Sequence, residues 1–252
     1  KDSLPFLPQT LSSIADQGVN FTNAFSTHPL CGPARGSILS GMSGRDSGVM
    51  ANADGAQMHA TDVIGYWMQQ AGYRTGLFGK YLHQVSAPSA PPEGWDEWQE
   101  LLTYEYFGFD LNVNGDVVTF PESAYSTDVL GTSLQRFISR NRNQPFFAVY
   151  APYAGHGPFS ASSRHEDSLL NVDPPRGPNF RSQNVAGKPA WVHWFKNIST
   201  LPEAQAIEQH RQQLRSLLAL DDAVGDVDEA LERFGLRDNT VVIFTSDQGI
   251  LH

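Results

Sequence analysis

Residues 126–150 read STDVLGTSLQRFISRNRNQPFFAVY, and this stretch decides the fold. Five apolar side chains recur at helical spacing from Val129 to Ile138, which predicts a helix over residues 126–142. The stretch ends in a continuous apolar run, Phe146 to Tyr150, which is typical of a strand buried on both faces of a parallel sheet. A helix that leads into a buried strand is the repeating unit of a layered α/β fold.

The same unit recurs on both sides of this stretch. Apolar spacing from Thr61 to Ala71 predicts a helix, and the following run, Thr75 to Phe78, predicts a strand. A long helical pattern over about residues 203–234 is closed by Gly235, and the run 240–244 predicts another buried strand. We therefore predict an α/β fold, an α/β/α sandwich with a largely parallel sheet, whose sites gather at the carboxyl ends of the strands.

The remaining chain adds shorter elements. Residues 5–16 have helical spacing and end near Gly18, and residues 19–25 alternate apolar and polar side chains, which predicts a short strand. A second helix is expected from Pro33 to Leu39, closed by Gly41. This arrangement puts Cys31 at or just before a helix N-terminus.

Two later segments lack helical periodicity. Asn114-Gly115 is a strong hairpin signal between residues 109–111 and 117–118. Residues 155–202 are rich in Pro, Gly, Ser and Asn, which predicts a long surface excursion of the kind that often carries function.

Composition excludes several classes of protein. The chain has 252 residues, 40% of them hydrophobic, which is enough for a large buried core. A net charge of -10 leaves no broad basic face for nucleic acid, and no apolar run is long enough to span a membrane. Cys31 is the single cysteine, so an internal disulfide framework and a multi-cysteine zinc site are excluded.

The segment Cys31-Gly32-Pro33-Ala34-Arg35 has two interpretations. One is a buried cysteine in a turn, which is the usual environment of an isolated cysteine. The other is a nucleophile in an anion site, because free N–H groups at a helix N-terminus and a nearby guanidinium both bind tetrahedral oxyanions.

A second segment also contains charged residues after a predicted strand. It comprises Gly72-Tyr73-Arg74-Thr75 and then Gly79-Lys80-Tyr81-Leu82-His83. By itself a Gly-Lys pair indicates a turn with a solvated lysine. The spacing does not match a nucleotide-binding P-loop.

Together these segments resemble the two signatures of the type I sulfatases. The first signature, Cys-x-Pro-Ser/Ala-Arg followed by Leu-Thr-Gly or a close variant, matches residues 31–35 and 39–41. The second, Gly-Tyr-x-Thr with Gly-Lys a few residues on, matches residues 72–75 and 79–80. The likeness extends from Pro8 to Gly249 and is greatest to the glucosamine-6-sulfatase and arylsulfatase branch. It implies an alkaline-phosphatase-like fold.

The resemblance also implies a reaction. A formylglycine-generating enzyme oxidises the signature cysteine of this family, so Cys31 is expected to become formylglycine, whose hydrate attacks sulfur. Covalent catalysis of this kind releases sulfate by elimination and restores the aldehyde. Arg35 would steady the diol, Lys80 would bind the sulfate and the leaving oxygen, and His156 would be a sulfate ligand or general acid. His83, one residue later than the family's histidine, is a further candidate for substrate binding.

A calcium ion, or occasionally magnesium, is implied as the metal. The expected ligands are Asp247, Gln248, which stands where the family usually has Asn, and the formylglycine made from Cys31. An aspartate pair belongs to the first strand of relatives, which we expect to lie upstream of residue 1. Asp221-Asp222 is not a substitute, since its helical context predicts a solvated face.

We thus expect residues 1–252 to form a single sulfatase catalytic domain that lacks the first strand and the C-terminal portion of its relatives. The expected substrates are sulfated carbohydrates, including glycosaminoglycans, or aryl sulfates. The expected location is secreted, periplasmic or lysosomal. Two alternatives are a phosphonate or phosphate monoester hydrolase on the same scaffold and an inactive carbohydrate-binding pseudoenzyme.

Overall fold

A five-stranded mixed sheet forms the centre of the molecule, in the order β4-β3-β2-β1-β5. The structure is a computed structural model that describes residues 3–82, 90–177, 184–195 and 202–249. The central strand β1 runs parallel to both of its neighbours, β2 and β5, whereas β2, β3 and β4 are antiparallel to one another in turn. The strands are β1 (Arg74–Gly79), β2 (Glu97–Leu101), β3 (Asp110–Val113), β4 (Asp116–Thr119) and β5 (Phe146–Ala151).

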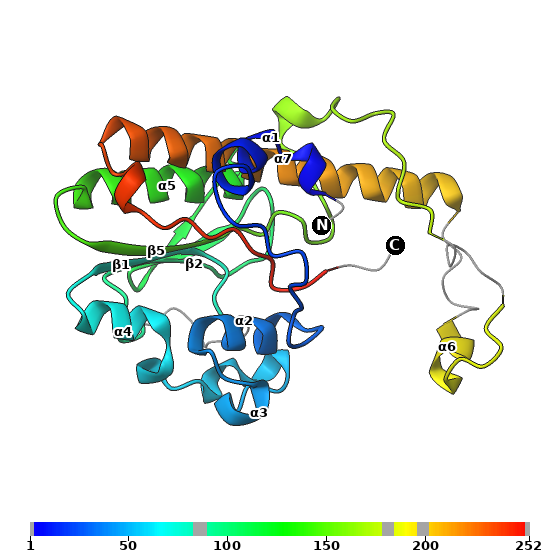
Figure 1. Cartoon of the computed structure of the whole chain (residues 1–252), viewed down its shortest axis with the longest axis horizontal. Coiled ribbons are helices and arrows are strands. Elements are labelled where there is room, and N and C mark those ends of the chain that lie inside the picture. Colours follow the sequence, from blue (N-terminus) through cyan, green and yellow to red (C-terminus); the bar gives the residue numbers. More distant parts are fainter. Residues whose placement is uncertain (1–2, 83–89, 178–183, 196–201, 250–252) are drawn as a thin grey trace.

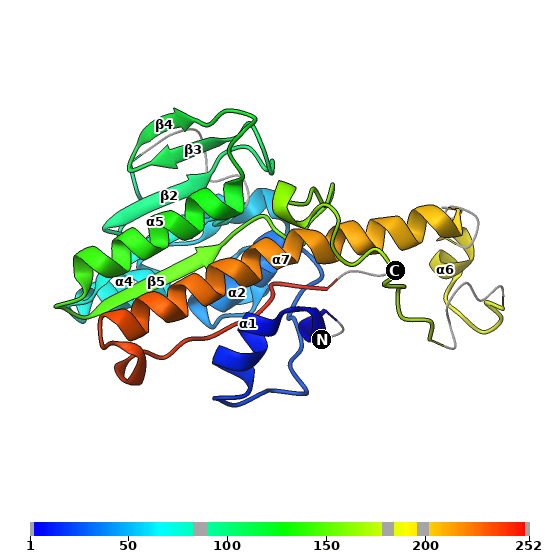
Figure 2. The same cartoon turned by 90° about the horizontal axis from the view of Figure 1, so that it is seen from above.

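Helices cover both faces of this sheet (Figures 1 and 2). The long helices α5 (Ser126–Asn141) and α7 (Glu203–Arg233) pack on one face, and α2 (Cys31–Ser40) and α4 (Ile64–Gln70) lie on the other. The shorter α-helices are α1 (Pro8–Thr10), α3 (Gly44–Ser47) and α6 (Ala190–Phe195). The remaining turns are the 3-10 segments Leu4–Phe6, Asn52–Gln57, Ala60–Asp62, Ser163–His165 and Arg237–Asn239, and the π-helical turn Leu11–Ala15.

Two hydrophobic clusters fill the layers on either side of the sheet. The larger cluster joins the sheet to α5 and α7, and in it the fully buried rings of Phe78 and Phe137 meet edge to face at 5.6 Å. The smaller cluster lies under α2 and α4 and is built around Tyr81, Trp95 and Trp98. The predicted α/β/α class is therefore confirmed, with a parallel centre and an antiparallel extension.

Turn chemistry explains several boundaries that the sequence predicts. The predicted hairpin joins β3 to β4, with Asn114 and Gly115 both at positive φ, 54° and 106°, as this turn requires. The helix that begins at Cys31 ends at Gly41, which adopts the left-handed conformation with φ 68°. The helix expected over residues 126–142 is α5, and the long pattern after residue 202 is α7.

Two predicted strands are wrong. Residues 240–244 and 19–25 form no strand, and most of their apolar side chains are exposed, for example Val241 at 87% and Phe21 at 78%, while Val242 packs against the larger cluster. An apolar pattern favours an extended backbone, but a strand forms only where a neighbour supplies hydrogen bonds. Residues 146–150 do form β5, yet they are half-buried, because β5 ends the sheet among the described residues.

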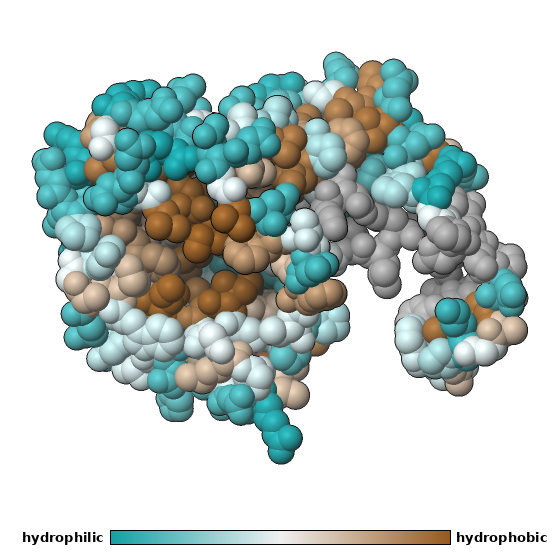
Figure 3. Space-filling view, viewed as in Figure 1, coloured by the Kyte–Doolittle hydropathy of each residue, from teal (hydrophilic) through white to brown (hydrophobic). Residues whose placement is uncertain are grey.

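The unpaired segment after residue 239 lies on a hydrophobic side of the molecule. Figure 3 shows a hollow with mostly hydrophobic walls on the side where Figure 1 draws β5 and the chain after residue 239. The exposed side chains of Val241 and Ile243 belong to that part of the chain. In the parts of the chain that the structure describes, no helix is both long and apolar enough to cross a membrane.

The interpretation of Asp221-Asp222 as a solvated face is wrong for Asp221. Its side chain is buried at 3% exposure and accepts hydrogen bonds from the N–H groups of Gln9 and Thr10 and from the Thr10 hydroxyl. It therefore binds the N-terminal turn of α1 to α7, where it satisfies backbone donors that the short helix leaves unpaired.

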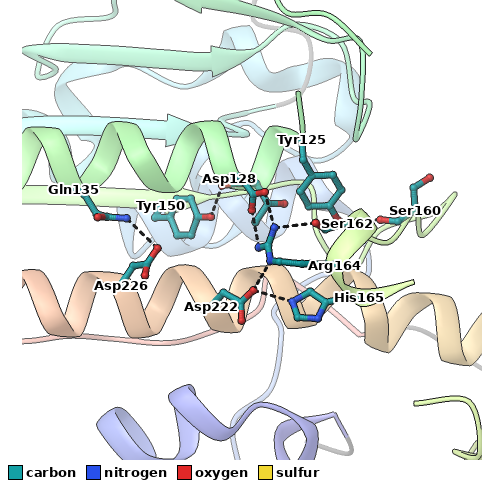
Figure 4. A network of polar contacts seen from close by, with 11 residues as sticks. Tyr125, Asp128, Gln135, Tyr150, Ser160, Ser162, Arg164, His165, Asp222 and Asp226 are labelled. Carbon is teal, nitrogen blue, oxygen red and sulfur yellow. Dashed lines mark hydrogen bonds and ion pairs between the residues drawn. The ribbon is translucent and has the colours of Figure 1, made fainter. Parts of the chain in front are cut away.

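Asp222, half-exposed, has different partners. It accepts from Arg164 Nε and contacts His165 Nε2, each at 2.7 Å, while Arg164 also forms a two-pronged pair with Asp128 of α5 (Figure 4). These bonds hold the loop after β5 to both long helices. Both aspartates are thus committed to structural contacts rather than to a metal.

Candidate active site

Cys31 is the first residue of α2 and is buried, with 5% of its surface exposed. Leu30 precedes the helix without a side-chain cap, and the N–H of Gly32 donates to Asn52 Oδ1 at 2.8 Å. Pro33 follows in the first turn, where its missing N–H costs nothing. The predicted position of Cys31 at a helix N-terminus is therefore confirmed.

Lys80 reaches the same place from the carboxyl end of β1. Gly79 has φ 120°, and a Cβ there would lie 2.1 Å from the carbonyl oxygen of Ala151, so only glycine makes this turn. The N–H of Lys80 donates to that same carbonyl at 2.7 Å. The side chain that results is buried, at 4% exposure.

The Lys80 ammonium has an unusual electrostatic environment. Burial lowers its pKa, and the nearby Arg35 guanidinium lowers it further, whereas Cys31 and Asp247 act in the opposite direction. None of the ion pairs between described residues includes Lys80. A buried cation of this kind favours an anionic ligand.

Arg35 joins three segments that are distant in sequence. Its Nε donates to Asp247 Oδ2 at 2.8 Å and its Nη1 donates to the Lys80 carbonyl at 2.7 Å. Ser26 donates to the main-chain carbonyl of Asp247 at 2.6 Å and fixes the other side of that residue. The segment after residue 244 is thus held at the site by side-chain contacts although it forms no strand.

Gln248 lies directly against the cysteine. Its Nε2 donates to Cys31 Sγ at 3.1 Å. We call the group made by Cys31, Arg35, Lys80, Asp247 and Gln248 the polar wall.

The polar wall contains part of a metal site. The Asp247 carboxylate and the Gln248 amide oxygen are hard donors of the type that calcium or magnesium prefers, but calcium takes six to eight oxygens. Within the described ranges, no group of three or more His, Cys, Asp or Glu side chains is arranged to hold a metal ion. The donor chemistry fits a hard cation, while the ligand number of the described residues alone is too small.

His156 lies on the loop after β5, with an exposed side chain. Its Nδ1 is 2.8 Å from the carbonyl oxygen of Gly157. Because a carbonyl only accepts, Nδ1 carries the proton, and Nε2 is the atom available for proton exchange. The buried Tyr106 holds this loop in place, because its hydroxyl donates to the His156 carbonyl at 2.7 Å.

A series of rings connects His156 with Lys80. The His156 ring stacks on Tyr153 at 4.8 Å, Tyr153 stacks on Tyr104 at 5.9 Å, and the Lys80 ammonium lies 4.8 Å from the centre of the Tyr104 ring. We call Tyr104, Tyr153 and His156 the aromatic wall. Burial raises the pKa of Tyr104 to about 12, so its hydroxyl stays protonated at neutral pH.

The structure thus brings together Cys31, Arg35, Lys80, Asp247 and Gln248, and connects His156 to them through rings. His83 lies outside the described residues. The sequence analysis did not identify Tyr104, Asn52 or Ser26, whose contacts with the site are long-range and belong to no motif. The only available signal for Tyr104 was its place in the aromatic segment that follows Trp95.

The chain is thus an α/β/α sandwich with a buried cysteine and a buried lysine near the carboxyl end of its central strand. The sulfatase family model matches residues 2–252, and the chain belongs to the sulfatase family.

Two curated relatives match nearly the whole chain. The Drosophila melanogaster "Extracellular sulfatase SULF-1 homolog" is 29% identical over 98% of this chain and 23% of its own length. The Homo sapiens N-acetylglucosamine-6-sulfatase is 29% identical over 96% of this chain and 48% of its own length. The chain therefore spans about a quarter to a half of the length of these relatives.

Solved structures share the fold. BT4656, in complex with its substrate D-glucosamine-2-N,6-O-disulfate, has a TM-score of 0.75 and 23% identity, covering 96% of this chain and 60% of its own. A phosphonate monoester hydrolase from Silicibacter pomeroyi has a TM-score of 0.60 and 18% identity, covering 89% of this chain and 54% of its own. One of these two neighbours is thus named with a sulfated sugar as its substrate, and the other is named as a phosphonate monoester hydrolase.

Proposed function

We propose that this chain hydrolyses sulfate esters of carbohydrates, with Cys31 as the precursor of a formylglycine nucleophile. The observation that carries the proposal is the buried Cys31 at the head of α2, with Gln248 against its sulfur and the Lys80 ammonium beside it. Membership of the sulfatase family and relatives named as N-acetylglucosamine-6-sulfatases support the same substrate class.

The side chains of the polar wall have complementary tasks in this proposal. Lys80 binds the non-bridging sulfate oxygens, and its buried charge stabilises the charge that develops on the leaving oxygen. Arg35 orients the nucleophile through α2 and holds Asp247 in place. His156 keeps its Nδ1–H on the Gly157 carbonyl, and in its doubly protonated form it gives the Nε2 proton to the departing alcohol and becomes neutral.

Calcium, with magnesium as the occasional replacement, remains part of the proposal. Asp247 and Gln248 would supply two oxygen ligands, and the residue made from Cys31 a third. Calcium takes more oxygens than these, so the remaining ligands would come from outside the described residues. A bound cation would neutralise sulfate charge.

We also propose that residues 1–252 form a single catalytic domain and that a formylglycine-generating enzyme modifies Cys31 during maturation. Relatives named as extracellular sulfatases support a location outside the cytosol, that is secreted, periplasmic or lysosomal. Substrates in this proposal are sulfated sugars such as glucosamine 6-sulfate and glycosaminoglycan chains, with aryl sulfates as convenient probes.

The test compares an aryl sulfate with the matching aryl phosphate, using protein produced together with a formylglycine-generating enzyme. We expect the sulfate to be turned over faster, and Cys31→Ala to lose activity by at least about 1,000-fold while its circular dichroism is unchanged. Mass spectrometry of the peptide that contains Cys31 reports the conversion of thiol to aldehyde in the same sample.

Each alternative gives a different result. Faster hydrolysis of the phosphate would assign the chain to the phosphate or phosphonate monoesterases. Converted Cys31 with no turnover of an aryl sulfate or of N-acetylglucosamine 6-sulfate would indicate a carbohydrate-binding pseudoenzyme. An unmodified thiol in material from the native host would do the same.

A further inference from the structure

We infer that the stacked rings of Tyr104 and Tyr153 fix Lys80 and His156 relative to each other, which makes Tyr104 a positioning residue. The inference rests on the proposed function, because it assumes that Lys80 and His156 act on the same bound sulfate ester. It concerns contacts that lie outside the sequence motifs.

The first support is the order of the stack. The Lys80 ammonium lies 4.8 Å from the centre of the Tyr104 ring, and Tyr104 and Tyr153 are 5.9 Å apart with an interplanar angle of 25°. Tyr153 and His156 follow at 4.8 Å and 27°. The four groups thus form one continuous series with near-parallel rings, a geometry in which aromatic and cation–π attraction both act.

The second support is the origin of these residues in the sheet. Lys80 follows β1, Tyr104 follows β2, and Tyr153 with His156 follows β5. These three strands are adjacent, in the order β2-β1-β5, and all run in the same direction. The stack therefore spans the carboxyl ends of the three strands and connects the three loops that follow them.

The third support is the rigid base under Tyr153. The Tyr106 ring, with 1% exposed, lies 5.1 Å from Tyr153, and its hydroxyl donates to the His156 carbonyl at 2.7 Å. The Tyr153 hydroxyl donates to the Gly157 carbonyl at 2.5 Å. A ring fixed at both its face and its hydroxyl keeps one orientation, so the stack transmits position from one end to the other.

At the other end of the stack the Lys80 ammonium lies over the Tyr104 ring, with Cys31 as its neighbour on the polar wall. A lysine side chain has four rotatable bonds and a compact charge. The Tyr104 ring, 4.8 Å from the ammonium, restricts those rotations. Positioning of this kind raises a reaction rate because reacting groups start from a productive geometry.

The experiment uses Tyr104→Leu, which removes the ring, and Tyr104→Phe, which keeps the ring and removes the hydroxyl. Phe120→Leu is the matched control, because Phe120 belongs to the same hydrophobic cluster but stacks on Phe109 at 4.8 Å, just after strand β4. Kinetics with an aryl sulfate are combined with the proton resonances of the Lys80 ε-methylene and the His156 ring.

We expect Tyr104→Leu to lower kcat about 10-fold or more, with KM changed less than about threefold, because orientation rather than ground-state binding is lost. Tyr104→Phe should stay within about twofold of the parent. In Tyr104→Leu both sets of resonances should shift, including those of His156, which stacks on the Tyr153 ring. Phe120→Leu should lower the melting temperature without either effect.

Three results would overturn the inference. Unchanged kcat and an unchanged His156 signal in Tyr104→Leu would remove the positioning role. An equal loss in Tyr104→Phe would assign the effect to the hydroxyl, and an equal loss in Phe120→Leu would assign it to general destabilisation. If the parent protein turned over no sulfate ester, the proposed function would fail, whereas the resonance comparison would still decide whether the stack couples Lys80 to His156.

Discussion

The polar wall and the aromatic wall meet at Lys80 but are held together by different forces. The polar wall depends on charged hydrogen bonds, chiefly those of Arg35 to Asp247 and to the Lys80 carbonyl. The aromatic wall depends on ring contacts and on tyrosine hydroxyls bonded to carbonyls of the loop. The comparison teaches that the charged groups around Cys31 are held by hydrogen bonds, whereas His156 is linked to Lys80 through ring contacts.

The largest effect on this comparison is expected from Arg35→Met. Loss of both guanidinium bonds leaves Asp247 without its partner and frees the loop of Lys80, so kcat/KM should fall by about 100- to 1,000-fold. Arg45→Met, at an exposed position of α3, is the control and should retain activity. A loss below about 10-fold in Arg35→Met would mean that the polar wall is held by other contacts.

The next effect comes from the loop end of the aromatic wall. His156→Gln keeps a hydrogen-bonding side chain but removes the titratable ring, so kcat should fall by about 10- to 100-fold, most strongly for substrates with poor leaving groups. His165→Gln, on the same loop but bonded to Asp222, should leave kcat nearly unchanged. Equal losses in the two variants would indicate that loop structure, not proton transfer, is responsible.

A third test concerns the pH dependence of stability that arises from the buried carboxyl group of Glu100 in β2. Glu100 of β2 is 6% exposed, and burial raises its pKa from 4.5 to about 7. Since the folded state holds this proton more tightly, stability is greatest below pH 4.5 as far as Glu100 is concerned and declines as the pH rises to about 7. The decline should amount to roughly 2–3 kcal/mol.

Glu100→Gln removes the titratable carboxyl group and therefore its pH-dependent contribution to the free energy of unfolding. Urea unfolding at pH 5 and pH 8 should therefore show a smaller loss of stability in the variant than in the parent protein. Glu97→Gln, in the same strand but paired with Arg140, is the control and should keep the parent's slope between these pH values. Identical slopes in the parent and in Glu100→Gln would contradict the assignment.

The smallest effect is expected from Val241→Ser. Val241 is 87% exposed although it precedes Asp247 of the polar wall, so the change should alter the free energy of unfolding by less than about 0.5 kcal/mol. Val149→Ser, in the half-buried β5, should cost about 1–2 kcal/mol. A large effect at Val241 would show that sheet pairing, rather than Arg35 and Ser26, holds Asp247.

The sequence predicts most elements that are fixed by local chemistry. The turn at Asn114-Gly115 and the parallel strands β1 and β5 follow from spacing and turn residues, and the helix predicted from Pro33 begins two residues earlier, at Cys31. The run 240–244 has the same apolar character as β5 but pairs with nothing among the described residues. Pairing depends on a neighbouring strand, which the local pattern does not contain.

The same limit applies to the site. Motif residues such as Arg35 and Lys80 are identified from a short stretch because their chemistry is local to it. Tyr104 and Asn52 contribute through contacts with residues about 20 or more positions away, and their types are common in loops and turns. Asp221 was misinterpreted for the same reason, since its partner Thr10 is 211 residues away.

The adjacent aspartates of α7 have a consequence for the helical register. Successive residues of a helix project about 100° apart, so Asp221 faces α1 while Asp222 faces Arg164. Removing one residue from α7 ahead of them would rotate both carboxylates away from their partners at once. A single deletion far from Cys31 would thus release both the N-terminal turn of α1 and the loop after β5 that carries Arg164 and His165.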